Sequence, residues 1–139
     1  GFPGETEEQF ETLCRFVREH PFDRMGVFTF SPEEGTPAAS FDGEVPEEEK
    51  RRRADVLMRI QREVSRALNE KRVGTRCDVL VEGFDRRRKQ YFGRSYGEAA
   101  EIDGRVYFAA GQEHSLGEFV PVRIMEALEY DLIGKEEKA

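Results

Sequence analysis

The 139-residue sequence contains no long apolar run and few cysteines. Because it has no stretch of about 18 uncharged apolar residues and its first residues are neither basic nor continuously apolar, we expect no membrane span, no secretory signal and a cytoplasmic location. The two cysteines, Cys14 and Cys77, are far apart in the sequence. This separation argues against a disulfide framework or a zinc site, since both need clustered residues. Internal repeats and low-complexity tracts are also absent.

Basic residues are in the minority: 22 lysines and arginines stand against 29 acidic residues, which gives a net charge of -7. A general nucleic-acid binder usually has the opposite balance. The sequence has no Ser-His-Asp arrangement, phosphate-binding glycine loop or metal-ligand spacing that would indicate a hydrolase or a nucleotide-binding protein. His20 stands beside a proline and His114 in a predicted turn, so both are expected at the surface without a catalytic role.

Two amphipathic helices are predicted before residue 73. The first begins after Thr6, which forms a capping box with Gln9. Its apolar residues recur at positions i, i+3, i+4 and i+7, namely Phe10, Leu13, Cys14 and Val17. The second helix, over residues 46–72, starts with a proline and three glutamates, which favour a helix N-terminus. Each helix therefore has one apolar face for a core.

Residues 24–31 are mostly apolar and predict a short strand buried on both faces by helices. A helix followed by a buried strand is typical of an α/β domain. Because a parallel strand needs neighbouring strands for its hydrogen bonds, residues 1–72 are predicted to be the end of a larger domain. The loop at 31–45 follows the C-terminal end of this strand, where parallel-sheet proteins carry their active sites.

After residue 73 the apolar periodicity changes from 3.6 residues to two. Five short strands are predicted, over about 75–83, 90–96, 105–110, 118–128 and 130–133. Joined by turns, they suit a small closed antiparallel barrel of the OB type. The chain is therefore predicted to have two domains, residues 1–72 and residues 73–139, of which the barrel should be the one that is stable by itself.

A basic and aromatic segment lies around the second predicted barrel strand. It comprises Arg86, Arg87, Arg88, Lys89, Tyr91, Phe92, Arg94 and Tyr96. These residue types form single-strand binding surfaces on OB-like barrels, which suggests RNA. The whole segment 73–139, however, has 10 basic and 13 acidic side chains, a balance that suits a basic protein partner better than a phosphate backbone. We favour the protein partner and keep RNA as the alternative.

Three motifs follow one another in the first 38 residues: Gly1-Phe2-Pro3-Gly4-Glu5-Thr6, Phe22-Asp23-Arg24-Met25-Gly26-Val27-Phe28 and Ser31-Pro32-Glu33-Glu34-Gly35-Thr36-Pro37-Ala38. Three further motifs lie in the barrel segment: Gly93-Arg94-Ser95, Glu101-Ile102-Asp103-Gly104 and Tyr130-Asp131-Leu132-Ile133-Gly134. In this order and spacing the chain resembles the C-terminal portion of the radical S-adenosylmethionine methylthiotransferases, and the barrel segment resembles their TRAM domain. The second motif and the last one are most similar to the members that modify a ribosomal protein rather than tRNA.

The resemblance implies a fold and a reaction. The fold would be the α/β end of an open TIM-like radical SAM barrel, followed by a small all-β TRAM barrel. The reaction would use S-adenosylmethionine and two 4Fe-4S clusters to add a methylthio group to the β-carbon of an aspartate in a small-subunit ribosomal protein. The alternatives are a tRNA methylthiotransferase and a non-catalytic OB-like module that binds RNA or protein.

The family's Cys-x-x-x-Cys-x-x-Cys motif is absent from this sequence. The cluster ligands are therefore expected outside this segment, which should be inactive alone, and no catalytic or metal-binding residue is assigned within it. We expect a monomer that binds no membrane, with the ribosomal protein as its partner and the ribosome or rRNA as a further one.

Two candidate sites follow from the resemblance and from the residue types. The cofactor-binding residues are predicted in the first turn, where glycine permits close approach, and at the end of the 24–31 strand: Gly1, Phe2, Pro3, Gly4, Glu5, Phe30 and Ser31. The substrate-binding residues are predicted on the barrel: Arg86, Arg87, Arg88, Lys89, Tyr91, Arg94 and Tyr96.

Overall fold

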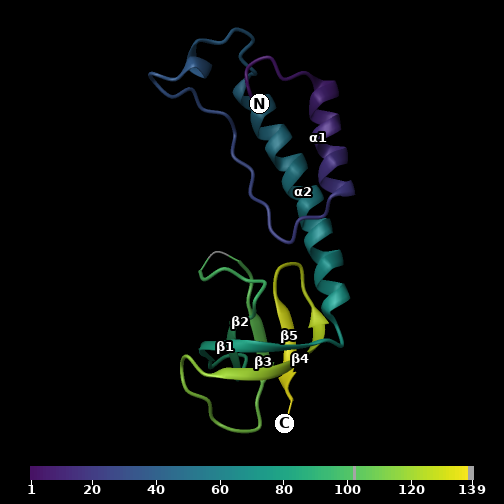
Figure 1. Cartoon of the computed structure of the whole chain (residues 1–139), viewed down its shortest axis with the longest axis vertical. Helices are drawn as coiled ribbons and strands as arrows, with labels where there is room; N and C mark the ends of the chain where they lie inside the picture. Colours follow the sequence, from purple (N-terminus) through teal and green to yellow (C-terminus); the bar gives the residue numbers. More distant parts are fainter. Residues whose placement is uncertain (102, 138–139) are drawn as a thin grey trace. The chain divides into compact units, whose positions relative to one another are not determined.

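The computed structural model describes residues 1–101 and 103–137 (Figure 1). The chain forms two compact units, Gly1–Val64 and Ser65–Ala139, and helix α2 (Glu47–Arg72) contributes residues to both. Each unit has an apolar core of its own. Ile102, which belongs to one of the TRAM-like motifs, lies outside the described residues.

In the first unit, helix α1 (Glu7–Glu19) packs against α2. The predicted capping box is present: the Gln9 backbone N–H donates to the Thr6 hydroxyl, and the Thr6 backbone N–H donates to the Gln9 side chain. These bonds satisfy two donors that a helix start otherwise leaves unpaired. The core of this unit consists of Phe10, Cys14, Val17, Leu57 and Ile60. The predicted apolar stripe of α1 is therefore buried, except for Leu13, which is 40% exposed.

The two helices run in the same direction. A long connection over residues 20–46 leads from the end of α1 back to the start of α2 (Figure 1). Contacts near both ends agree with this direction. Arg52 pairs with Glu7 close to both N-termini, and Gln61 donates to the carbonyl of Phe22 beyond the end of α1. The connection contains one short 3-10 helix, η1 (Pro37–Ser40).

Residues 24–31 are extended, but they have no strand partner among the described residues. Met25 and Val27 pack on the helical core, whereas Phe28 is 95% exposed. The prediction of a buried strand is therefore wrong for this chain. A strand exists through its hydrogen-bonded neighbour, and the described residues form their one sheet in the second unit.

Helix α2 begins and ends as the sequence predicts. Glutamates occupy its first turn, and Lys71 and Arg72 occupy its last, so the side-chain charges oppose the helix dipole at both ends. The helix is 26 residues long and strongly charged. Within the described ranges, no helix combines the length and the apolar character that crossing a membrane requires.

The second unit is a closed five-stranded barrel that follows the last turns of α2 (Figure 1). Its strands are β1 (Arg76–Asp85), β2 (Gln90–Arg94), β3 (Val106–Ala109), β4 (Phe119–Ala127) and β5 (Leu132–Glu136). Around the barrel their order is β1-β2-β3-β5-β4, with β4 paired to β1. The predicted barrel of five strands is confirmed, although β5 begins and ends later than predicted.

One strand pairing differs from the predicted antiparallel barrel. Strands β3 and β5 pair in parallel, whereas the other four pairs are antiparallel. The reason is geometric, because a closed ring with an odd number of strands cannot alternate in direction all the way round. One parallel pair is the smallest departure that lets five strands close.

The barrel core is built from alternate residues of the strands. Its buried members are Val79, Val81, Val106, Phe108, Val120, Val122, Ile124 and Leu132. Gly93 marks a close approach between neighbouring strands, because a Cβ at this position would lie 1.9 Å from the carbonyl oxygen of Leu80. Because Gly93 has no side chain, β1 and β2 can approach each other closely at this point.

Candidate functional site

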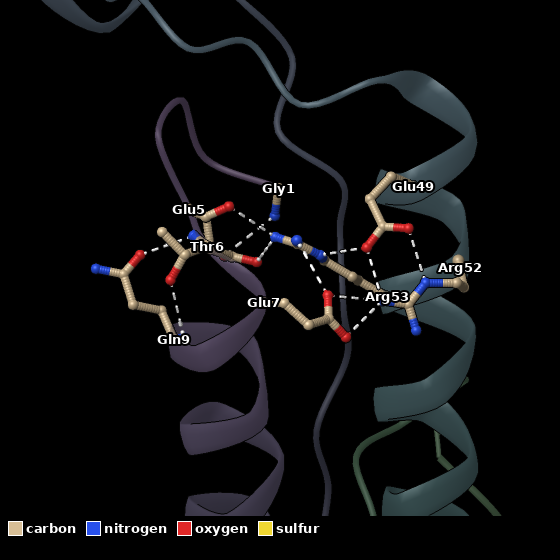
Figure 2. A network of polar contacts seen from close by, with 8 residues as sticks. All are labelled: Gly1, Glu5, Thr6, Glu7, Gln9, Glu49, Arg52 and Arg53. Atoms are coloured by element: carbon tan, nitrogen blue, oxygen red, sulfur yellow. Dashed lines mark hydrogen bonds and ion pairs between the residues drawn. The ribbon is translucent and has the colours of Figure 1, made fainter.

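The turn before α1 is held against α2 by charged side chains (Figure 2). The guanidinium of Arg53 donates to the backbone carbonyl of Glu5 at 3.1 Å and to its carboxylate at 2.6 Å. It also donates to Glu49 at 2.8 Å and to Glu7 at 3.3 Å. The Arg53 side chain is only 8% exposed, so these donors have fixed protein partners instead of water. The predicted cofactor-binding turn is thereby anchored to a helix.

Arg52 forms a second, more exposed link between the two helices (Figure 2). One of its nitrogens lies 2.8 Å from Glu7 and 2.6 Å from Glu49. Hydrogen bonds from Arg52 and Arg53 lower the pKa of Glu49 from 4.5 to about 2. Glu49 is therefore an anion at neutral pH that holds both arginines toward the turn.

The backbone of the turn depends on two glycines. Gly4 has a φ of +80° and Gly43 a φ of +84°, a region that other residues rarely adopt. The Gly4 N–H donates to the Gly43 carbonyl at 2.7 Å, and a Cβ on Gly43 would lie 3.2 Å from the Gly4 nitrogen. The loop between the helices thus approaches the turn through two residues that have no side chain.

An aromatic cluster lies beside the turn. The ring of Phe2 packs edge-on against Phe30, with centroids 5.2 Å apart, and against Phe41 at 5.9 Å. The ammonium of Lys50 lies 5.6 Å from the Phe30 ring centroid, and its buried side chain pairs with Glu47 at 2.6 Å. The structure therefore brings together the predicted residues Phe2 and Phe30.

The remaining predicted residues of this site lie along the same turn or next to Phe30. Gly1, Pro3 and Ser31 have no side-chain role in the network, and Ser31 is exposed. Phe41 was missed by sequence reasoning. Its only signal is that it is an aromatic residue in a loop rich in glycine and proline, which does not reveal contact with a ring 39 positions earlier.

The turn fits part of a nucleoside-containing cofactor such as S-adenosylmethionine. A Cβ on Gly4 would meet nothing within 4 Å, so one side of the turn is open. Phe2 and Phe41 are about half exposed, at 47% and 51%, and aromatic rings of this kind can stack on a base. Both features match the chemistry of an adenosyl group.

Iron-sulfur clusters do not fit the described part of the chain. Its residues include no group of three or more His, Cys, Asp or Glu side chains that could hold a metal ion. Cys14 is buried in the helical core and Cys77 lies in the barrel. Burial raises the pKa of both thiols, which is typical of unreactive structural cysteines.

The predicted substrate-binding residues of the barrel do not form one surface. Arg86, Arg87, Arg88 and Lys89 are exposed in the β1–β2 turn, where the backbone N–H groups of Arg87 and Arg88 donate to Asp85. Tyr96 is 91% exposed but lies beyond the opposite end of β2. Arg94, on the intervening strand, pairs with Glu82.

Tyr91 contributes to the interior instead of the surface. Its ring lies 5.8 Å from Phe108, a core residue. Its hydroxyl accepts a hydrogen bond from the His114 backbone N–H at 3.1 Å. The structure thus places this tyrosine where it supports the loop between β3 and β4.

A ridge of stacked arginines and aromatic rings runs along β2 and β3. It consists of Phe92 on β2, Tyr107 on β3, and Arg88 and Arg105, which lie just before these strands. Arg88 lies 4.2 Å from the Tyr107 ring centroid and Arg105 lies 4.6 Å from the Phe92 centroid. Phe92 and Tyr107 are register partners. Sequence reasoning missed Arg105 and Tyr107 because their place beside Phe92 depends on the pairing of β2 with β3. Each arginine covers one face of its ring, which is then closed to a stacked nucleic-acid base.

A buried ion pair joins the end of α2 to the loop after β2. Arg72 donates to Glu98 at 2.5 Å and to the Ser95 hydroxyl at 2.7 Å. The Glu98 side chain is 1% exposed. Burial alone would raise the pKa of Glu98, but hydrogen bonds from Ser95 and Arg72 outweigh burial and lower it. The carboxylate is therefore ionised inside the barrel unit because it has these partners.

Residues 73–136 match the TRAM domain family. The chain is 45% identical, over 97% of its length, to the protein named ribosomal protein uS12 methylthiotransferase RimO of Caldanaerobacter subterraneus. Proteins of the same name from Desulforudis audaxviator and Pelotomaculum thermopropionicum are 52% and 51% identical over 95% and 97% of the chain. The sequence of the chain is therefore similar to the C-terminal part of proteins with this name. It spans about 30% of the length of these RimO relatives.

The TRAM match coincides with the barrel. It begins just after α2 ends at Arg72 and stops at the last residue of β5. All five strands lie within it. The predicted TRAM domain is therefore confirmed. The turn before α1 and the aromatic cluster lie in the part of the chain that precedes it.

Proposed function

We propose that the chain is part of a radical S-adenosylmethionine enzyme that adds a methylthio group to the β-carbon of an aspartate in ribosomal protein uS12. The observation that carries this proposal is the similarity to the RimO relatives, 45 to 52% identity over at least 95% of the chain. An alignment of this length extends over both units of the chain. The similarity is therefore not a likeness of the TRAM domain alone.

Residues 1–72 are proposed to complete the cofactor-binding domain of this enzyme. When bound, S-adenosylmethionine and two 4Fe-4S clusters would supply the radical that abstracts hydrogen from the target carbon, and the sulfur that replaces it. The cluster ligands are proposed to come from residues outside these 139. The proposed task of this segment is to hold the turn Gly1–Glu5 and the residues Phe30 and Ser31 beside the adenosyl group.

The barrel is proposed to dock the protein substrate. Its segment has 10 basic and 13 acidic side chains, which favours association with a basic ribosomal protein. The arginine-covered rings of the ridge also argue against stacking of RNA bases. The exposed turn Arg86–Lys89 is the feature that favours the alternative, a tRNA-modifying enzyme, because it offers cations to a phosphate backbone.

The test is a titration of the 139-residue chain with uS12 and, separately, with a tRNA anticodon arm, each at low and moderate salt. We expect binding to uS12 and at least tenfold weaker binding to the RNA. Preferential RNA binding with a steep salt dependence would instead support the tRNA-modifying alternative. In that case the double variant R86Q/R87Q should bind RNA more weakly and reduce the salt slope, and an unchanged slope would exclude the β1–β2 turn as the contact.

A further inference from the structure

A surface hollow on the barrel lies between the β3–β4 loop and the neighbouring strands. Its volume is about 350 Å³, which is room for roughly ten water molecules. The residues that line it come from this loop, from the start of β4 and from the end of β5, and include Gly111, His114, Glu118, Phe119, Pro121 and Glu136. None of them belongs to either of the sites predicted from the sequence.

Two carboxylates of the hollow are held in place by backbone donors. One oxygen of Glu118 accepts a hydrogen bond from the Ser115 N–H at 3.0 Å. One oxygen of Glu136 accepts a hydrogen bond from the Gly111 N–H at 2.8 Å. Hydrogen bonds from Ser115 and His114 lower the pKa of Glu118, which keeps it ionised at neutral pH. The hollow therefore presents two anions in fixed positions.

His114 lies between these two carboxylates. Its side chain is 2% exposed, with Nδ1 2.9 Å from Glu118 and Nε2 3.4 Å from Glu136. Nε2 is buried and has no hydrogen-bond partner among the described residues. A neutral imidazole donates through one nitrogen only, so a ring that donates to Glu118 turns a lone pair toward Glu136. Even a protonated ring would leave two negative charges against one positive charge.

The charge of the hollow is not balanced by other lining residues. The described residues that line it include no lysine or arginine. A third carboxylate, Glu137, also lines it, but this one already accepts a hydrogen bond from Arg123. The uncompensated charge thus lies at Glu118 and Glu136.

Part of the wall of the hollow is apolar. It contains Val120, Pro121 and the 68%-exposed ring of Phe119. A long basic side chain can bury its aliphatic stem along an apolar surface while its charged end pairs with an anion. An aromatic ring can add a cation–π contact to the charged end.

We propose that this hollow binds an arginine or lysine side chain of the ribosomal protein substrate. The identity of the partner rests on the proposed function. The choice of a basic side chain rests on the two fixed carboxylates, the enclosed histidine and the apolar wall. These features together match a long side chain that ends in a cation.

The hollow can be tested without the substrate by NMR titration of the 139-residue chain with N-acetylarginine amide. The matched control ligand is N-acetylcitrulline amide, which has a similar shape and no charge. We expect saturable shifts at the Gly111 amide and the His114 ring with the arginine probe, and at least tenfold weaker binding of the citrulline probe. The absence of saturable shifts, or equal binding of the two probes, would overturn the proposal.

Variants then locate the binding site. E118Q and E136Q remove one charge each but keep an oxygen acceptor for the backbone N–H, and each should weaken arginine binding about tenfold. E126Q makes the same charge change at an exposed position of β4 outside the hollow, and should stay within about twofold of wild type. Unchanged signals from the buried barrel core verify that each variant is folded. Equal effects of all three variants would contradict the proposal.

Titration of the same variants with uS12 separates this inference from the proposed function. Tenfold weaker uS12 binding by E118Q and E136Q, but not by E126Q, would support both. Equal uS12 binding by wild type and all variants would overturn the inference and leave the proposed function standing. Binding of the arginine probe without any binding of uS12 would overturn the assigned partner together with the docking role of the barrel.

Discussion

At the residue scale, single side chains connect segments that are far apart in the sequence. Arg53 reaches the carboxylate of Glu5, 48 positions earlier, and Glu49 receives hydrogen bonds from both Arg52 and Arg53. Arg51, Arg52 and Arg53 follow three glutamates in α2, and such i,i+3 and i,i+4 pairs are common on solvated helix faces. The structure shows that two of these arginines also hold the turn.

Replacing Glu49 by glutamine should remove an acid-sensitive part of the stability of the first unit. Because the pKa of Glu49 is lowered to about 2 from 4.5, its stabilising contribution is present above about pH 4.5 and is lost as the pH falls toward 2. Urea unfolding at several acidic pH values, followed by circular dichroism of the helices, should show a smaller loss for E49Q than for wild type. E48Q, at an exposed neighbouring position, is the matched control. Equal pH profiles for wild type and E49Q would contradict this role.

Replacing Gly93 by alanine should destabilise the barrel. The added Cβ would lie 1.9 Å from the Leu80 carbonyl oxygen, so β1 and β2 must move apart, at a cost of about 3 kcal/mol. At Gly111 a Cβ would be 3.9 Å from its nearest neighbour, and G111A should stay within about 0.5 kcal/mol of wild type. Chemical denaturation of the two variants provides the comparison. Equal stabilities would show that the strand pair can relax around a side chain.

At the element scale, secondary structure was predictable where the local sequence pattern favours an element and the tertiary structure supplies the partner that this element needs. The capping box at Thr6, the limits of α2 and the five barrel strands all follow from short-range patterns that the structure satisfies. Residues 24–31 have an equally strong apolar pattern but no hydrogen-bonded neighbour among the described residues. The pattern identified an apolar segment, and pairing decides whether such a segment is a strand.

Replacing Arg72 by methionine should destabilise the barrel unit and raise the pKa of Glu98. The variant leaves a carboxylate that is 1% exposed without its cation, which costs about 3–5 kcal/mol. Arg66 forms an exposed pair with Glu70 on the same helix, so R66M should cost less than about 1 kcal/mol. Chemical denaturation and a carbon-detected NMR titration of Glu98 measure the two effects. Similar stabilities of R72M and R66M would show that the buried pair contributes little.

At the scale of the whole molecule, the chain consists of two units that are stabilised by different interactions. The barrel closes on itself, so every strand has two hydrogen-bonded neighbours. The first unit has two helices, a smaller buried core and an extended segment without a strand partner among the described residues. Both units expose aromatic rings: Phe28 in the first is 95% exposed and Tyr96 in the second is 91% exposed.

The two units should therefore unfold separately, the first before the barrel. We expect two transitions in thermal unfolding, with amides of the barrel core protected from hydrogen exchange after the helices of residues 1–64 have lost protection. Limited proteolysis should likewise cleave within residues 20–46 before it cleaves the barrel. A single transition with uniform exchange protection would show that the two units fold as one cooperative structure.

Capping residues, apolar periodicity and motif order are local or linear properties, so both helices, the five barrel strands and the resemblance could be predicted from the sequence. It could not determine which residues meet. The contact of Arg53 with Glu5, the stacking of Arg105 on Phe92 and the enclosure of His114, which was expected at the surface, all depend on strand register and helix packing. These contacts join residues that are distant in the chain or that lie in a loop folded over a barrel, and only the tertiary structure brings their charges together.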